Sequence, residues 1–253
     1  SALKKLGSAY VEETAVGAAM VSREYQRLAG MKDRKNIITS ACAAVVSLVE
    51  KYYPDLIGQL APVVSPMIAH GRALRKRFGQ DIKVVFIGPC LAKKEEYKDL
   101  QNDSVIDAVI TFEELQRWLS EEGVSVEEGR GQKDSGFEGC ISRFYPVPGG
   151  ILKTIDAERS NFECVSIDGI ENCIEVLDSL RVGSVEGYFI EMNSCPGGCV
   201  NGPCTALTEG GYLLARARIK KYVSSSTGTN PSRIPDIGDD IKKTFVDRST
   251  WFR

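Results

Sequence analysis

Apolar residues follow two different periods along this chain. Short runs rich in β-branched and aromatic residues occupy 36–38, 83–87, 105–110, 162–167 and 187–192, and such runs are typical of buried strands. Between them, apolar residues recur at helical spacing over 12–29, 40–54, 66–78, 112–119 and 170–181. Strands that alternate with helices in this way predict an α/β fold, with mainly parallel sheets flanked by helices.

Polar residues mark the starts of three of these helices. Thr39 or Ser40 is the expected N-cap of the helix that follows the first strand. Ser65, which precedes a proline, predicts another helix start. Thr111 and Glu114 have the spacing of a capping box, which predicts that a helix opens at residue 112.

The order of the elements predicts two lobes within one domain of residues 1–223. A stretch rich in Gly and charge at 123–150 separates a first lobe, about 1–122, from a second, about 151–223. The tail at 224–253 begins with Ser, Gly and Pro and predicts a linker followed by a short C-terminal helix. We expect the functional site to lie between the two lobes. We also expect the strands to be grouped in chain order: the strands near 36 and 84 belong to the first lobe, and the strands near 162 and 189 belong to the second.

Composition narrows the class of protein. The 253 residues are 43% hydrophobic and 26% charged, which is ordinary for a globular chain. Lys and Arg number 32 against 34 Asp and Glu, so no strongly basic field is available for nucleic-acid binding. No apolar run approaches the roughly 18–20 residues of a membrane span. The chain starts without Met and without a signal-peptide core, which predicts a processed or truncated N-terminus and a cytoplasmic location.

The chain has eight Cys and a single His, His70. One imidazole excludes His-rich metal sites, and a disulfide framework suits short secreted chains better than one of this size. Four of the Cys follow the ends of three predicted strands, which are the edges where open α/β sheets usually bind ligands. These four are Cys42, Cys90, Cys195 and Cys199.

The other four Cys have different surroundings. Cys164 lies inside a strand-like run and Cys173 at helical spacing with apolar residues, so both are expected to pack in the core. Cys140 and Cys204 lie in Gly-rich loops, where either a spare thiol or a functional group is compatible with the sequence.

Zinc and an iron–sulfur cluster are the candidates for a shared thiolate site. Structural zinc usually takes paired Cys knuckles, whereas here two single Cys precede the pair Cys195-Pro-Gly-Gly-Cys199. Single ligands from distant strands favour the larger iron–sulfur cluster, and zinc stays open at this point.

Three segments resemble the signature segments of the iron-only (FeFe) hydrogenases, in the same order. They are TSACAAVVSLVEKYYP at 39–54, FIGPCLAKKEE at 86–96 and EMNSCPGGCVNGP at 191–203. The resemblance implies a 4Fe–4S cubane held by four Cys, one of which also bridges to a diiron unit carrying CO, cyanide and a dithiolate. Matched motif by motif, the implied cubane ligands are Cys42, Cys90, Cys195 and Cys199, with Cys199 as the bridge.

The resemblance also assigns roles to other residues. Lys93 matches the lysine that hydrogen-bonds a cyanide ligand, and an ammonium suits an anionic ligand. Glu96 matches the acidic residue of the second motif, and Ser65 matches a polar position beside the diiron unit.

Departures from the family pattern lie around the diiron unit and spare the four Cys. Catalytic members have two adjacent Cys in the first motif, and the first of them delivers protons, but this chain has Ala41. Alanine has no exchangeable proton, so the implied relay is broken at its innermost step. Gly88 replaces a Met of the second motif, Asn193–Ser194 replaces Met-Ala in the third, and Pro203–Cys204 interrupts its glycine run.

This pattern resembles the sensory branch of the family and predicts slow turnover with a response to H₂. Cys140, Cys204 or Glu24 is available as a substitute proton relay. The expected partners are H₂ and protons, the maturation proteins, and a redox partner or an attached signalling domain. The alternative is a non-catalytic iron–sulfur or zinc interaction module, in which the metal only holds two lobes together.

Overall fold

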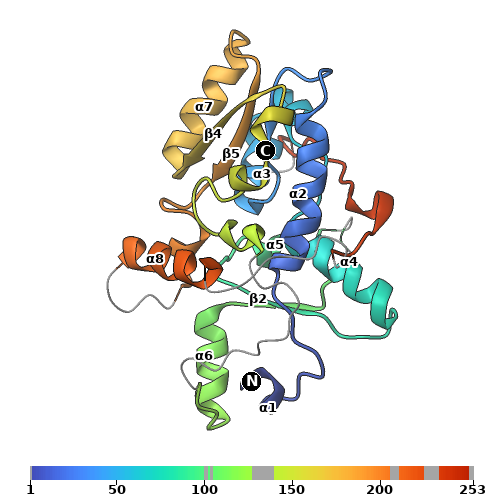
Figure 1. Ribbon diagram of the computed structural model, residues 1–253, viewed down its shortest axis with the longest axis vertical. Coiled ribbons are helices and arrows are strands. Elements are labelled where there is room, and N and C mark those ends of the chain that lie inside the picture. The colour runs from blue at the N-terminus through green and yellow to red at the C-terminus, as the bar shows by residue number, and fades with distance from the viewer. Residues whose placement is uncertain are drawn as a thin grey trace.

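The computed structural model describes residues 2–99, 102, 105–126, 140–205, 211–224 and 234–250 of the chain. Its strands form two parallel sheets (Figure 1). The larger sheet has the order β1–β5–β4, made of Ile37–Ile38, Tyr188–Asn193 and Glu163–Asp168. The smaller sheet pairs β2 (Val85–Ile87) with β3 (Ala108–Ile110). The predicted α/β fold with parallel sheets flanked by helices is confirmed.

The predicted grouping of the strands into lobes was wrong. β1 pairs with β5, with Ile38 opposite Ile190, so the strand near 36 shares a sheet with those near 162 and 189. Among the described strands, the one near 84 pairs with β3 and with no other. Chain order alone does not decide which parallel strands become neighbours, because crossover connections let distant strands pair when that buries both.

The larger sheet is covered on both faces. Ile37 and Phe189 belong to a core cluster that includes α2 (Ala15–Ala29), whereas Ile38 and Ile190 belong to a second cluster with α3 (Ala43–Tyr52) and α7 (Ile170–Val182). Successive strand residues point to opposite faces, so each strand contributes to both clusters. In Figure 1, α2 and α7 flank β5 on opposite sides.

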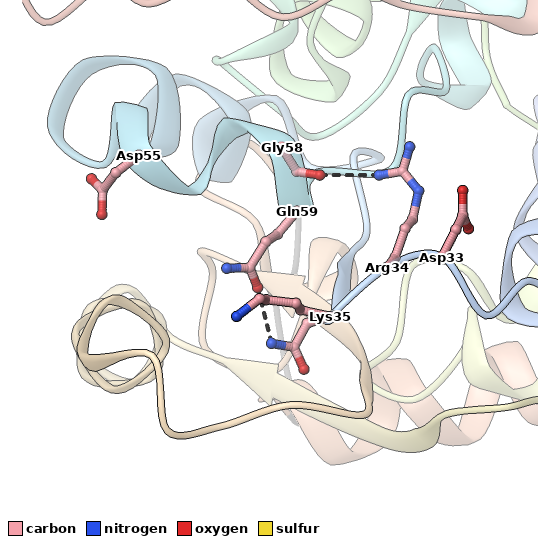
Figure 2. A pocket seen from close by; sticks show the side chains of 7 residues that line it. Asp33, Arg34, Lys35, Asp55, Gly58 and Gln59 are labelled. Carbon is pink, nitrogen blue, oxygen red and sulfur yellow. Dashed lines mark hydrogen bonds between the residues drawn. The ribbon is translucent and has the colours of Figure 1, made fainter.

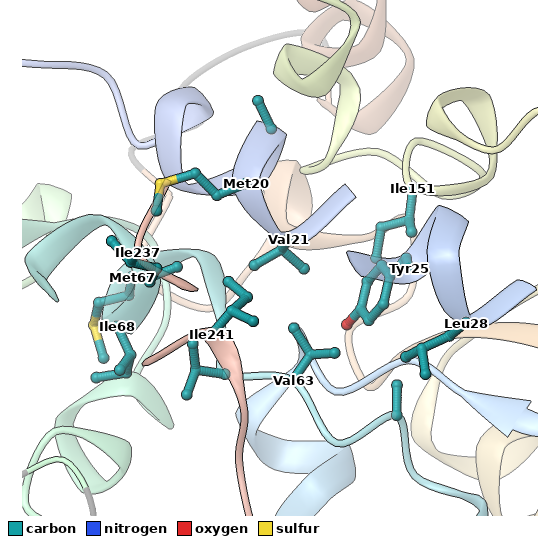
Figure 3. Packing of buried hydrophobic residues seen from close by; sticks show 14 of the residues in the cluster. Met20, Val21, Tyr25, Leu28, Val63, Met67, Ile68, Ile151, Ile237 and Ile241 are labelled. Atoms are coloured by element: carbon teal, nitrogen blue, oxygen red, sulfur yellow. The ribbon is translucent and has the colours of Figure 1, made fainter. Parts of the chain in front are cut away.

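A close helix crossing joins α2 to α4 (Pro66–Phe78). A Cβ added at Gly17 would lie only 2.1 Å from the carbonyl oxygen of Pro66 and 2.7 Å from the Cβ of His70. Glycine is therefore needed at this contact. Figure 3 shows the apolar side chains that pack around the crossing, with the tail contributing Ile237 and Ile241.

Two of the predicted helix starts were right and one was wrong. The Thr111 hydroxyl accepts the Glu114 N–H at 3.1 Å and the Glu114 carboxylate accepts the Thr111 N–H at 2.7 Å, which opens α6 (Phe112–Glu121). Ser65 precedes α4 as predicted. The N-cap of α3 is Cys42, not Thr39 or Ser40.

The side chains of Thr39 and Ser40 form hydrogen bonds to residues outside the helix α3. The Thr39 hydroxyl accepts the Met192 N–H at 3.2 Å, and the Ser40 hydroxyl donates to the Val63 carbonyl at 2.7 Å. Side chains engaged in these tertiary bonds are not available to cap a helix.

The described part of the tail, 234–250, contains one 3₁₀ turn, η8 (Gly238–Ile241), instead of the predicted C-terminal helix. The predicted linker lies mostly outside the described residues, after α8 (Gly211–Ser224). Near its end, Arg248 pairs with Glu50 at 3.0 Å and with Asp99 at 2.6 Å, which fastens the tail to two parts of the fold. The remaining short elements are α1 (Ala2–Lys5), α5 (Lys93–Glu96), η1 (Pro54–Gln59), η3 (Ile141–Phe144), η4 (Leu152–Thr154), η5 (Ala157–Arg159) and η6 (Cys199–Asn201).

Within these described ranges, no helix has both the length and the apolar character that crossing a membrane requires.

Candidate metal centre

The first candidate ligand, Cys42, lies where the chain leaves β1. Ile37 and Ile38 are fully buried, and Cys42 follows in an extended conformation as the N-cap residue of α3. Its thiol is free and the residue is half-buried. The strand end therefore presents this thiol beside the first turn of a helix.

The second candidate, Cys90, follows β2 after a Gly-Pro pair. The Gly88 N–H donates to the Ile110 carbonyl at 3.1 Å, which extends the pairing with β3 by one residue. The Phe86 ring lies 2.8 Å from where a Cβ of residue 88 would be, so the ring occupies the space that a larger side chain at 88 would need. Gly88, which replaces the Met of the family motif, therefore leaves room for the Phe86 ring.

The pair Cys195 and Cys199 lies in the turn after β5. Gly197 and Gly198 have φ of +81° and +78°, a backbone region that favours glycine. The Gly197 N–H donates to the Asp168 carboxylate at 2.6 Å, and the Gly198 N–H to the Cys195 carbonyl at 2.9 Å. The turn is therefore held by the neighbouring strand end and by itself.

The four thiols lie in one electrostatic environment. Burial raises the pKa of Cys199 strongly, and negative charge on Cys42, Cys90 and Cys195 raises it further. Burial also raises the pKa of Cys195, with added contributions from Cys42 and Cys90. Because such interactions fade with distance, the three strand ends hold these thiols near enough for the charge of one to act on another. Among the described residues, no three His, Cys, Asp or Glu side chains are grouped so as to hold a single metal ion.

Lys93 is the cation of this pocket. Its Nζ donates to the Ala41 carbonyl at 3.1 Å and to the Glu96 carboxylate at 2.5 Å, and both side chains are almost fully buried. Burial is the largest single influence on the pKa of Lys93 and lowers it, but the charge and hydrogen bond of Glu96 together with the charges of Cys90 and Cys42 outweigh burial, so the net pKa is raised. The ammonium in turn lowers the pKa of Cys199.

Ser65 is fully buried, and its hydroxyl has no hydrogen-bond partner among the described residues. It is the N-cap residue of α4 by position, but its side chain does not cap the helix. A buried hydroxyl without a partner costs free energy, so such a group indicates a polar neighbour that the protein itself does not supply.

The three candidates for a substitute relay lie in different surroundings. Burial raises the pKa of Cys204, as do the charges of Glu113, Glu114 and Cys90, so this thiol is within electrostatic reach of one candidate ligand. Cys140 lies 2.6 Å from the Ser142 hydroxyl, next to η3. Glu24 is bound by Arg27 through three contacts of 2.6–3.1 Å, which occupy both of its carboxylate oxygens.

The two Cys expected in the core are there. Cys173 is fully buried in the second core cluster, where its thiol donates to the Asn193 carbonyl at 3.5 Å, and burial raises its pKa to about 12. Cys164 packs against the first core cluster, and burial raises its pKa as well. All eight Cys are free thiols.

Sequence reasoning gave no role to Glu191 or to the Ser194 hydroxyl. Glu191 is fully buried, and its carboxylate accepts four N–H groups, from Gly149, Ile151, Leu152 and Asn193, at 3.0–3.2 Å. Burial raises its pKa to about 7 even so. A carboxylate inside the apolar strand FIEMN was the signal that could have identified it.

A surface cavity of about 440 Å³ lies elsewhere (Figure 2). Lys35 and Asn36, which precede β1, line it together with Asp33, Arg34, Asp55, Gly58 and Gln59. The Asn36 side-chain amide donates hydrogen bonds to the Gln59 side chain and to the Val185 carbonyl. This cavity is at the opposite end of β1 from Cys42 and is separate from the thiols.

The residues at the strand ends fit a thiolate-bound iron–sulfur group. Four free thiols that follow strand ends are a soft donor set, and the buried ammonium of Lys93 belongs to the second motif and interacts with Cys42, Cys90 and Cys199. The raised pKa values of Cys195 and Cys199 mean that binding such a group must release protons.

Comparison with known proteins relates this chain to iron-only hydrogenases and to an iron–sulfur assembly protein. A family model described as "Iron only hydrogenase large subunit, C-terminal domain" matches residues 1–203. The periplasmic [Fe] hydrogenase large subunit of Nitratidesulfovibrio vulgaris is 27% identical over 80% of this chain and 60% of its own length. The cytosolic iron-sulfur assembly component 3 of Bos taurus is 23% identical over 79% of this chain and 54% of its own length.

The fold has solved counterparts. A variant of [FeFe]-hydrogenase HydA1 from Chlamydomonas reinhardtii has a TM-score of 0.72 at 17% identity, covering 97% of this chain and 86% of that one. This likeness concerns the fold. The chain spans about half the length of the curated relatives it matches, with 44% and 60% of two of them covered.

Proposed function

The chain belongs to the iron-only hydrogenase large-subunit family, and from that premise we propose that it binds a 4Fe–4S cubane through Cys42, Cys90, Cys195 and Cys199. The observation that carries this proposal is that four free thiols follow the ends of three separate strands, with the charges of Cys42, Cys90 and Cys195 acting on Cys199. A single-ion zinc site is the competing use of the same thiols, but among the described residues no three candidate ligands are grouped to hold one ion.

We further propose that the matured protein carries a diiron unit with CO, cyanide and a dithiolate, bridged to the cubane by Cys199. When bound, this group would supply the chemistry that activates H₂. The role of Lys93 would be to donate a hydrogen bond from its ammonium to an anionic ligand, because Lys93 is buried and its charge acts on Cys199. The Ser65 hydroxyl, which has no hydrogen-bond partner in the described part of the chain, would supply a second polar contact.

The slow H₂ turnover that we propose follows from alanine at position 41. Its methyl group neither holds nor transfers a proton, and loss of a positioned acid or base typically lowers a rate by about 10²–10⁴-fold. We therefore propose a domain that responds to H₂ with slow turnover. It would work with maturation proteins and with a redox partner or an attached signalling domain.

A cytoplasmic location is part of the same proposal. The support is mixed, since one relative is named cytosolic and another periplasmic. The absence of a strongly basic field makes nucleic acid an unsuitable partner.

The test of cubane binding is iron and acid-labile sulfide analysis of anaerobically purified protein. One cubane predicts about four of each per chain. Cys90→Ser and Cys195→Ser should lose most of the iron, whereas the control Cys164→Ser should keep it, because Cys164 packs against the core away from the strand ends. Zinc in place of iron, or equal iron in all variants, would refute the proposal.

A non-catalytic iron–sulfur interaction module is the second candidate. Ala41 favours it, and so does the similarity to a protein named as an iron-sulfur assembly component. Infrared spectroscopy after anaerobic maturation separates the two functions. CO and cyanide bands require a diiron site, while a full complement of iron and sulfide without those bands favours the module.

A further inference from the structure

The Ser194 hydroxyl lies beside one candidate ligand, and Ser194 directly precedes another in the chain. The Cys42 thiol donates to the Ser194 Oγ at 3.7 Å, and Ser194 is followed by Cys195. Cys42 follows β1 and Ser194 follows β5, so this contact joins two strand ends.

The direction of this hydrogen bond changes when the thiol loses its proton. In the metal-free protein the Cys42 thiol donates and the Ser194 oxygen accepts. A thiolate that holds a metal only accepts, so the serine hydroxyl then becomes the donor.

The two polar groups of the pocket reach the sulfurs in different ways. Ser194 contacts Cys42 directly, whereas the Lys93 ammonium interacts through its charge with Cys42, Cys90 and Cys199. Hydrogen bonds to ligand sulfurs are among the factors that set the potential of an iron–sulfur cluster, because they stabilise the form with more negative charge. The reduced form of a cluster carries one more electron and gains most from such a donor.

We propose that Ser194 is a tuning residue that raises the reduction potential of the cubane by donating a hydrogen bond from its hydroxyl to the sulfur of Cys42. This inference rests on the proposed cubane site and goes beyond it, since it concerns the potential at which the site accepts an electron. It does not depend on the diiron unit. The protein can therefore be studied in the form that carries the cubane alone.

The experiment compares wild type with Ser194→Ala, Ser194→Thr and the remote control Ser179→Ala. Ser179 is on α7, where its hydroxyl donates to the Glu175 carbonyl. A redox titration followed by EPR should show a lower potential for Ser194→Ala, and a potential near wild type for Ser194→Thr and for Ser179→Ala. Pulsed EPR in D₂O should show a coupling from an exchangeable deuteron that only Ser194→Ala loses.

The outcomes distinguish the two proposals. A wild-type chain that binds no iron and sulfide refutes the cubane site and the tuning together. A cubane present at equal potential in wild type and Ser194→Ala, with the deuteron coupling unchanged, overturns the tuning role and leaves the cubane site standing. Because a purely structural role would not remove one deuteron coupling and restore it with threonine, the spectroscopic result is specific.

Discussion

The Nζ atom of Lys93 lies 3.1 Å from the backbone carbonyl oxygen of Ala41. This contact joins the second cysteine motif to the first, although the two residues come from different strand ends. Position 41 is therefore beside the buried ammonium, next to the first candidate ligand, Cys42.

Ala41→Cys should increase H₂ turnover of the matured protein. A thiol at position 41 would return a proton-carrying group beside Lys93, and a positioned acid or base is worth about 10²–10⁴-fold in rate. The measurement is H₂ production and oxidation normalised to iron content. Ala43→Cys is the matched control, because it places a thiol on the other side of Cys42. An unchanged rate at full iron content would contradict the assignment of Ala41 as the missing relay position.

The Lys93–Glu96 pair should contribute to stability in the metal-free protein. Only 11% of the Lys93 side chain and 6% of the Glu96 side chain is exposed, so removing one partner leaves a buried charge unpaired. Lys93→Met should lower the free energy of unfolding by about 3–5 kcal/mol, and Lys93→Met with Glu96→Met should recover most of that loss. Urea unfolding of the metal-free variants measures both. A double variant as unstable as Lys93→Met would show that the cost comes from packing rather than from the unpaired carboxylate.

Gly198→Ala should disturb the cysteine turn more than a comparable change elsewhere. A Cβ at 198 would lie 2.8 Å from the Pro146 carbonyl oxygen and 2.9 Å from the Pro148 ring. Gly79 has a similar backbone, with φ +93° and ψ 169° against φ +78° and ψ −170°, but open space around it. Both variants suffer strained dihedrals, of about 1–3 kcal/mol each.

The difference between the two glycine variants isolates the steric contact. Overpacking adds about 1–3 kcal/mol, so Gly198→Ala should have the lower melting temperature and the lower iron content. Equal melting temperatures and equal iron content would mean that the 146–148 segment moves aside without cost.

Glu191→Gln should change how stability depends on pH. Burial raises the pKa of Glu191 to about 7 from a usual 4.5, so folding favours its protonated form. The stability that this group contributes is full below pH 4.5 and is lost as the pH rises through 7, up to about 3 kcal/mol in total. Glutamine does not titrate, so the cost of the substitution should grow as the pH falls from 8 toward 4.5.

Urea unfolding of wild type and Glu191→Gln at a series of pH values tests this difference. All other titrating groups are common to the two proteins, so their contributions cancel in the difference between the two free energies of unfolding. A cost that stays constant between pH 5 and pH 8 would show that Glu191 keeps one protonation state throughout that range.

Much of the local structure could be predicted from the sequence. The capping box at Thr111 and Glu114 formed as expected, because both partners lie within one helical turn. The short β-branched runs became parallel strands, and Cys164 and Cys173 entered the core. In contrast, Thr39 and Ser40 were expected to cap α3 but bond to Met192 and Val63, which are remote in the chain.

The sequence by itself determined where strands and helices occur and that four thiols follow strand ends, because these features depend on residues only a few positions apart. The tertiary structure decided that β1 joins β5, that Lys93 contacts Ala41, and that Ser194 contacts Cys42. Such contacts arise when helices and strands bury their apolar faces against each other, and the free energy of that packing is a property of the assembled core rather than of any one segment.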